Sequence, residues 1–266
     1  MRSAFALLRA AWLTATSYRV GTLLSLAGVA ASVVPVYFIA DAIQDVAAQS
    51  IQRESGSYFA FIVVGIASVY LVSAATGALA TAIASTIGNG TLEALLVTRT
   101  RLPALLAGLS AHATVQACLR AGILLVTGSL LGAEISWRFA PLAVGIAGIT
   151  FAAYAGIGLV AAALVLVFRT SGPLITAVVT VSGLLGGAYY ATAAVPGWLR
   201  VITDFVPLTY GLRPARMLLL GNATWQEVTQ DVSLLVMIAV GSLLIGALSF
   251  ALALRRARRD GTLSQY

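Results

Sequence analysis

The sequence Gly-Thr-Leu-Glu-Ala-Leu-Leu-Val-Thr-Arg-Thr-Arg-Leu-Pro occupies residues 90–103, between two long apolar runs. Thr91 can cap the turn that follows, and Glu93 falls in the first turn, where a carboxylate suits the positive end of a helix. One face of such a helix would contain Leu92, Leu95 and Leu96. The stretch therefore predicts a short helix with one apolar side, suited to docking a soluble partner. An ordinary amphipathic connector is the alternative.

The composition around this stretch is that of an integral membrane protein. Hydrophobic residues make up 60% of the 266 residues and charged residues 9%, whereas a soluble surface needs about a quarter charged residues. The length allows about six spans of roughly 20 apolar residues each, in one membrane domain over residues 1–266. Because the apolar residues do not alternate with period two, we predict an all-α membrane protein rather than a β-barrel.

Several kinds of chemistry are excluded by single residue types. All sixteen basic residues are arginine, so a phosphate-binding loop that needs lysine is impossible and any nucleotide hydrolysis must be done by another polypeptide. One cysteine, Cys118, and one histidine, His112, rule out an internal disulfide and a multi-histidine metal site. We therefore predict no catalytic residue, metal or cofactor in this chain. The arginines are not gathered with aromatic residues on one surface, so nucleic acid is not an expected partner.

The hydropathy pattern predicts six spans, at residues 20–40, 58–86, 104–131, 141–168, 173–190 and 232–254. Residues 1–19 form a predicted interfacial helix, because Arg2, Arg9 and Thr16 recur every seven residues on one side. A signal peptide is the alternative for this segment. A polar loop after the first span is expected to contain Asp41, Asp45, Arg53 and Glu54.

The arginines also predict the orientation of the chain. Ten lie on the side of both termini, against two in the short loops opposite, Arg53 and Arg138. Because cytoplasmic loops carry the excess of basic residues, both termini are predicted to be cytoplasmic.

Residues 191–231 are too apolar for an ordinary loop and too broken for a span. The prolines predict one short helix from Pro196 that stops before Pro207 and a second from Pro214 to Leu220. Two re-entrant helices in the outer half of the bilayer fit this pattern. Their expected anchors at the membrane surface are Trp198, Tyr210 and Trp225.

These motifs resemble the permease subunits of the type-2 class of ATP-binding-cassette (ABC) exporters. The first cytoplasmic loop has Gly-Thr-Leu-Glu and two further leucines, at residues 90–96. The later segment has Pro-Gly-Trp-Leu at 196–199, Pro-Leu-Thr-Tyr at 207–210, Arg216, and a Leu-rich turn ending at Gly221. The sequence departs from the family pattern at residues 87–89, which lack the charged residues expected there, and at Arg99, where proline is common.

The resemblance implies a dimer of permeases, from a second copy or a homologous chain, in a bacterial plasma membrane. It also implies separate ABC ATPase subunits, which would bind ATP and Mg²⁺. Residues 87–103 would be the coupling loop, with Gly90 and Thr91 preceding Glu93 and the leucines. The first and fifth spans would line the substrate path. In the fifth, the small polar groups are Thr176, Thr180 and Ser182. Gly183 and Gly187 have the spacing that permits close helix approach, or packing alone.

Arg120 is the charge that the third span places inside the bilayer. His112, Gln116 and Arg120 recur every four residues and form one polar stripe. An unpaired charge there costs roughly 2.5–3.5 kcal/mol, so a partner is expected. A structural role, with Asp204 or carbonyls of the re-entrant segment as the partner, and a role in the substrate path both remain open.

For the function, the resemblance implies export. The few aromatic residues of the predicted spans form no stripe suited to stacking sugars, which favours an amphiphilic drug, antibiotic or lipid-like substrate over lipid-linked polysaccharide, the alternative cargo. An ion-coupled secondary transporter is a further alternative, but it needs carboxylates inside the spans, and none of the predicted spans contains Asp or Glu. A membrane-embedded enzyme would need clustered catalytic groups, which a single histidine does not supply.

Overall fold

The computed structural model describes residues 19–51, 54–91, 102–168, 170, 172–192, 195–221 and 223–259. Within these ranges the chain is helical, with turns and irregular connections and no strand. The elements in order are α2 (Arg19–Ile51), α3 (Tyr58–Gly88), α5 (Leu102–Leu130), the 3-10 turn η1 (Trp137–Phe139), α6 (Ala140–Phe168), α7 (Gly172–Leu185), α8 (Gly197–Thr203), α9 (Pro207–Leu219) and α10 (Trp225–Arg259). The all-α prediction is therefore confirmed for the described chain.

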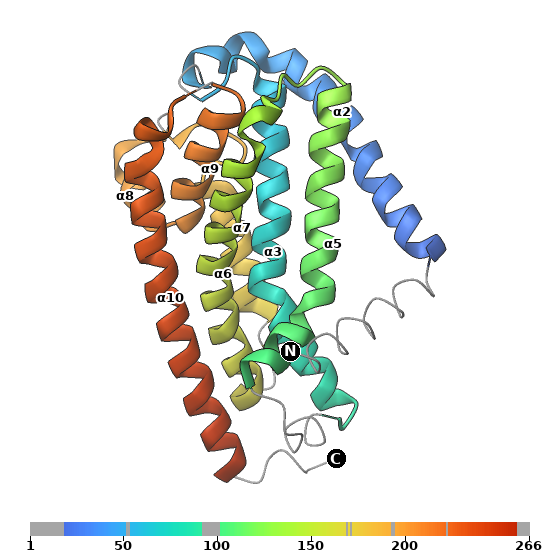
Figure 1. The fold of residues 1–266 in the computed structure, drawn as a ribbon, viewed down its shortest axis with the longest axis vertical. Coiled ribbons are helices and arrows are strands. Elements are labelled where there is room, and N and C mark those ends of the chain that lie inside the picture. The colour runs from blue at the N-terminus through green and yellow to red at the C-terminus, as the bar shows by residue number, and fades with distance from the viewer. Residues whose placement is uncertain are drawn as a thin grey trace.

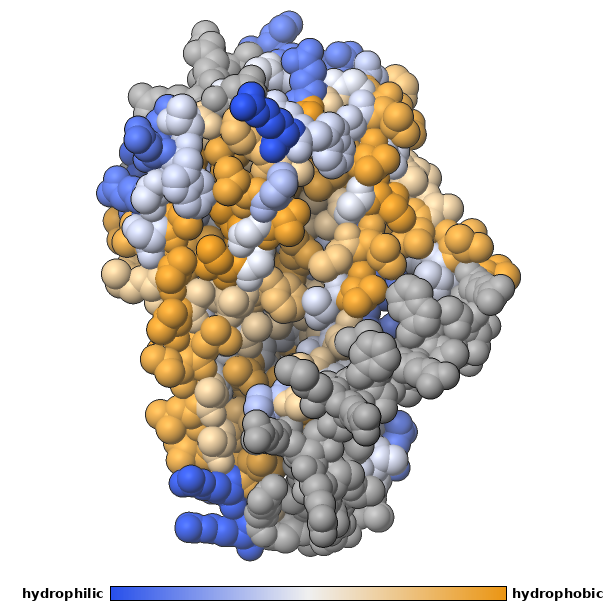
Figure 2. Space-filling model, viewed as in Figure 1, coloured by the Kyte–Doolittle hydropathy of each residue, from blue (hydrophilic) through white to orange (hydrophobic). Residues whose placement is uncertain are grey.

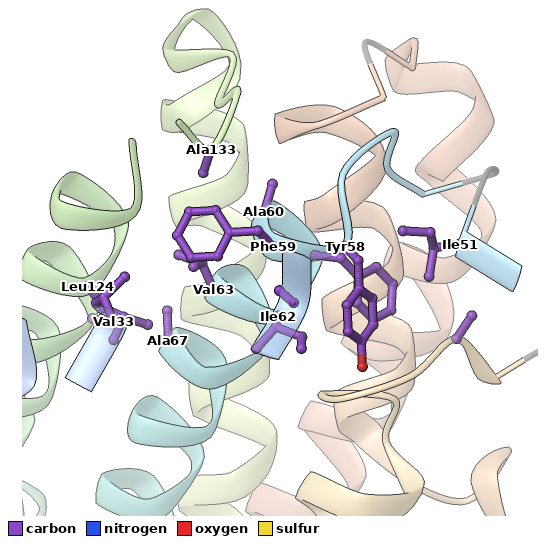
Figure 3. Packing of buried hydrophobic residues seen from close by; sticks show 14 of the residues in the cluster. Val33, Ile51, Tyr58, Phe59, Ala60, Ile62, Val63, Ala67, Leu124 and Ala133 are labelled. Atoms are coloured by element: carbon purple, nitrogen blue, oxygen red, sulfur yellow. The ribbon is translucent and has the colours of Figure 1, made fainter. Parts of the chain in front are cut away.

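The long helices form a bundle around α3. Helix α3 packs against α5 on one side and α6 on the other, while α10 packs along α6. Figure 1 shows α2 leaning away from the bundle at the edge, and α8 and α9 gathered in one half of the molecule beside α10. The buried α3 side chains contact both α2 and α5. In Figure 3 the labelled side chains of this cluster include Val33 from α2, Val63 from α3 and Leu124 from α5.

Small residues bring the helices together. Gly156 of α6 and Gly246 of α10 lie against each other's helix backbone, so neither has room for a methyl group. Ser242 Oγ donates to the Ala153 carbonyl at 2.8 Å across the same pair of helices. Gly158 of α6 lies similarly close to the backbone of α3. Because lipid tails are as apolar as leucine, close packing of this kind and interhelical hydrogen bonds stabilise membrane helices against one another.

Five helices of the described chain are long and apolar enough to cross a membrane, by length and composition. They include the predicted first, second, third, fourth and sixth spans. The predicted fifth span is α7, which has 14 residues and is about 21 Å long, less than the roughly 30 Å of a hydrocarbon core. The count of six spans therefore stays a prediction. Figure 2 shows the hydrophobic residues as a broad band, with hydrophilic residues gathered at both ends of the molecule.

Four predicted boundaries are wrong. Helix α10 begins at Trp225, seven residues before the predicted start of the sixth span, because polar residues in its first turns lower the hydropathy without ending the helix. Helix α2 continues to Ile51, so Asp41 and Asp45 lie on the helix instead of in a loop; hydropathy marks where apolar residues end, and a helix can continue beyond that point. Helix α7 ends at Leu185 instead of residue 190. Helix α9 begins at Pro207 instead of Pro214, because a proline is favourable in the first helical turn and Pro214 is accommodated inside the helix.

The predicted interfacial helix at residues 1–19 lies outside the described residues, apart from Arg19 at the start of α2.

Candidate functional site

The chain breaks its helix where α7 ends. Gly187 has a φ of +81°, which favours glycine, and it leads into an irregular segment through Thr192. Gly186, Gly187 and Ala188 in this segment are buried. Irregular backbone at membrane depth is tolerated only where the protein buries it and satisfies its hydrogen bonds. The carbonyls released by the end of α7 therefore need donors from elsewhere in the fold.

Arg216 of α9 supplies those donors. Its Nη1 donates to the Gly187 carbonyl at 2.7 Å, and its Nη2 donates to the Ala188 carbonyl at 2.9 Å. Nε and Nη2 also donate to the Phe61 carbonyl of α3, at 3.1 and 2.9 Å. The side chain is 1% exposed. Arginine thus joins three segments that lie far apart in the sequence.

The charge of Arg216 is balanced by Glu54, which lies between α2 and α3. Nη1 is 3.4 Å from Glu54 Oε2, and both residues are buried. With this contact, five bonds match the five N–H groups of the guanidinium. The guanidinium also lies over the ring of Phe61, 3.3 Å from its centroid. A buried ion pair is stable only when the remaining donors are satisfied in this way.

Gly65 of α3 makes room for this arrangement. A Cβ at this position would collide with the Ala188 carbonyl and lie 2.6 Å from Arg216 Nη2. Tyr58, at the start of α3, adds a bond to the same segment, from its hydroxyl to the Tyr189 carbonyl at 2.9 Å. Figure 3 shows this hydroxyl pointing away from the other labelled side chains of the cluster.

Tyr154 of α6 fixes the start of α9 against α7. Its hydroxyl donates to Ser182 Oγ at 2.8 Å and accepts from the Leu208 backbone N–H at 3.3 Å. Leu208 is the second residue of α9, and its N–H belongs to the first turn, where helices lack internal partners. Val206, the cap residue, makes no side-chain cap bond. The tyrosine therefore acts as the cap from a neighbouring helix.

The predicted path residues of α7 fall on two different sides. Thr176 and Thr180, four residues apart, are exposed on one face. Ser182 is 4% exposed and accepts the Tyr154 bond on the other face. Gly183 and Gly187 are not a helix-packing pair, because α7 ends between them and a Cβ at Gly183 would make only ordinary contacts. The interpretation of these two glycines as close-approach residues is wrong.

Arg120 lies at the contact between α5 and α2. Its Nη2 donates to Ser25 Oγ at 3.1 Å, and its Nε is buried without a hydrogen-bond partner. Within the described ranges, no ion pair joins it to Asp204, the partner that the sequence suggested. The predicted structural pairing with Asp204 is therefore wrong, because Arg120 points towards α2.

Two of the predicted coupling residues lie at the end of α3. Gly90 has a φ of +65°, its N–H donates to the Ile87 carbonyl, and the Thr91 N–H donates to the Thr86 carbonyl at 2.9 Å. This pattern of two reversed bonds after the last turn is a Schellman cap. The remaining coupling residues lie outside the described residues: Leu92, Glu93, Leu95 and Leu96. Gly90 and Thr91 thus end α3 immediately before the predicted coupling helix.

Sequence reasoning missed the pairing of Glu54 with Arg216. The only sequence signal was an arginine within an apolar stretch, where a charge requires a buried partner. Glu54 lies 162 positions away, so no local spacing could identify it. The sequence predicts Glu54 only as a member of a polar loop, because its neighbours are polar.

The fold and site define a class of protein: a polytopic α-helical membrane protein in which the short apolar helix α7 ends in a buried irregular segment bonded by an arginine. The chain matches the model of the ABC-2 type transporter family over residues 3–220, and it belongs to this family. Members are membrane components of ABC transporters, usually not catalytic themselves, and membership implies partnership with an ABC ATPase. No match to the chain is found among curated proteins.

Proposed function

We propose that this chain is the permease of an ABC exporter that moves an amphiphilic drug, antibiotic or lipid-like substrate out of the cytoplasm. A separate ATPase subunit binds and hydrolyses ATP, and two permeases pair in the bacterial plasma membrane with their termini in the cytoplasm. The observation that carries the proposal is the uncovered face of α7. It presents the hydroxyls of Thr176 and Thr180, whereas the opposite face is held by Tyr154 and α3.

The geometry of α7 supports a path along this face. Helix α7 is shorter than a bilayer, and its last residue, Leu185, leads directly into the buried segment that Arg216 holds. A substrate moving along Thr176 and Thr180 would therefore meet the segment that Arg216 holds. The mixture of hydroxyls with exposed apolar neighbours such as Val181 and Leu184 suits an amphiphile.

The buried carboxylate of Glu54 does not favour an ion-coupled transporter. It lies between α2 and α3 and is paired with Arg216 at 3.4 Å. A coupling carboxylate must gain and lose its ion or proton during transport, whereas this one balances a fully buried guanidinium.

Glu93 and its neighbouring leucines transmit the conformational change that ATP hydrolysis drives in the ATPase subunit. For the permease assembled with its ATPase, we expect Glu93→Ala to leave insertion and dimerisation intact while lowering both transport and substrate-stimulated ATP hydrolysis. Vesicle transport and phosphate release are the measurements. Unchanged coupling in this variant contradicts the assignment. ATP hydrolysis by the rigorously isolated chain would contradict the separate ATPase.

The path part is tested by variants within α7. We expect Thr176→Val and Thr180→Val to change the relative transport rates of amphiphilic substrates while leaving the melting temperature nearly unchanged, because both side chains are exposed. Ser182→Ala is the matched variant on the buried face. It is expected to lower the melting temperature, because it removes the acceptor of the Tyr154 hydroxyl. Unaltered selectivity in both threonine variants contradicts the path.

A further inference from the structure

Arg120 carries a charge in the interior of helix α5, several turns from either end. It lies about 27 Å along the helix from Leu102 and about 15 Å from Leu130 at 1.5 Å per residue. A charge in this place marks a functional site by default, provided that no internal partner neutralises it.

The two intramembrane arginines of the fold differ in how their donors are used. Arg216 donates five hydrogen bonds, and one of the five acceptors is a carboxylate. Arg120 has one neutral partner, the Ser25 hydroxyl, and a buried Nε without an acceptor. In the described part of the chain it forms no ion pair with a carboxylate. Arg120 thus retains both its positive charge and unused donors directed into the contact between α2 and α5.

The α2 side of this contact has open space. Gly21 and Gly28 lie four residues before and three residues after Ser25, on the same side of the helix. A Cβ at either glycine would meet no atom of the described residues within 4 Å. Leu24, next to Ser25, is 72% exposed. A group larger than water therefore has room beside the serine, with apolar surface next to it.

The polar stripe of α5 continues away from Arg120. Gln116 is half-buried one turn earlier, and His112 is exposed two turns earlier. Both side chains can donate hydrogen bonds to an anion. The stripe and Ser25 together form a set of donors, and none of the ion pairs in the described part of the chain involves them.

We infer that the seam between α2 and α5, defined by Ser25 and Arg120, binds the phosphate headgroup of an anionic amphiphile. The planar guanidinium fork matches phosphate oxygens, and the single bond to Ser25 leaves most of its N–H donors unused. The acyl chains would lie along the exposed apolar residues of α2, among them Leu23 and Leu24. The headgroup belongs either to a lipid that resides in the seam or to a transported amphiphile.

The test measures lipid binding to the purified full chain, independently of transport. The protein is delipidated, incorporated in phosphatidylcholine nanodiscs and titrated with phosphatidylglycerol of the same acyl composition. Retained lipids are counted by native mass spectrometry. We expect the wild type to bind phosphatidylglycerol selectively and Arg120→Gln to lower that affinity about tenfold or more, because a charge-assisted fork is lost.

Three variants make the result specific. Arg255→Gln removes one exposed arginine at the end of α10 and is expected to keep the wild-type affinity. Arg120→Lys keeps the charge without the fork, so an intermediate affinity is expected. Ser25→Ala removes only the hydroxyl. If Arg120→Gln does not fold, the lipid affinities of Ser25→Ala and Arg120→Lys are compared with that of the wild type instead. Equal binding of the two lipids by the wild type, or equal selectivity in Arg120→Gln and wild type, overturns the inference.

A second arm separates the two sources of the headgroup. In the permease assembled with its ATPase, headgroup-labelled phosphatidylglycerol that reaches the opposite leaflet only with ATP, and not in Arg120→Gln, identifies a transported amphiphile. Label that stays bound through many turnovers identifies a resident lipid. Because binding is measured without ATP, failure of the proposed export leaves the binding result intact.

Discussion

The guanidinium of Arg216 lies over the ring of Phe61, with its central carbon 3.3 Å from the ring centroid, while its Nε and Nη2 donate to the carbonyl of the same residue. One residue of α3 therefore contacts both the face and the edge of the cation. The other donors reach Glu54 and the segment after α7. The position of the irregular segment after α7 thus depends on a single side chain from α9.

Replacing this side chain is expected to be costly. Arg216→Gln leaves Glu54 buried and unpaired, and it removes donors from the carbonyls of Gly187 and Ala188. We expect the free energy of unfolding to fall by about 3–5 kcal/mol. Reversible unfolding in mixed detergent micelles measures it. The matched control is Arg213→Gln, whose pair with Asp231 is 3.6 Å long and partly exposed, and for which a loss of about 1 kcal/mol or less is expected. Equal losses in both variants would contradict the anchoring role.

Gly65 provides a test of the same contact from the side of α3. In Gly65→Ala the new methyl group would collide with the Ala188 carbonyl, which is backbone and cannot swing away. We expect a loss of about 1–3 kcal/mol in the free energy of unfolding. Gly148→Ala on the exposed face of α6 meets nothing within 4 Å, and it is expected to gain about 0.5–1 kcal/mol. Opposite signs for two identical substitutions distinguish close approach from general helix propensity.

The sequence predicted the long helices because their signal is local. Helices α3 and α6 have continuous apolar composition, and their predicted starts, at residues 58 and 141, lie within one residue of the observed ones. The end of α2 was missed because Asp41 and Asp45 look like a loop to a hydropathy argument, although a helix can continue into water. Gly187 was misread because its spacing from Gly183 suits a helix, and only the fold reveals its positive φ.

The site was less predictable because its contacts are distant in sequence. Thr176 and Thr180 share one face by their spacing alone, so placing them together needed no structure. Ser182 was grouped with them although it lies on the other side of α7, where it meets Tyr154 from another helix. Arg120 lies within α5, as the predicted third span requires, but its neighbour Ser25 is 95 residues away. Pairings of this kind depend on how the helices pack, which single-sequence periodicity does not contain.

Tyr154→Phe tests the cap that α6 provides to α9. The substitution keeps the ring and removes only the hydroxyl, leaving the Leu208 N–H without its acceptor in a buried place. A loss of about 1–3 kcal/mol in the free energy of unfolding is expected. Tyr210→Phe is the comparison, since that hydroxyl donates to the Asp204 carbonyl at an exposed position, and its loss is expected to be smaller. If the two variants lose the same stability, the buried hydroxyl does not cap α9.

Substitution of Gly90 tests whether this residue of the Gly-Thr-Leu-Glu motif has a structural role or a role in coupling. Its φ of +65° ends α3, and alanine in this left-handed conformation costs about 1–2 kcal/mol. We therefore expect Gly90→Ala to lower the melting temperature of the isolated permease. Gly88→Ala is matched to it, since Gly88 is the last residue of the helix, has no positive φ and would meet nothing within 4 Å. That variant is expected to be neutral or slightly stabilising.

Glu93→Ala is expected to leave the melting temperature of the isolated chain unchanged while impairing ATPase coupling. A normal melting temperature in Gly90→Ala would show that the glycine is not required as a cap, and its place in the motif would then have to be explained by contact with the ATPase.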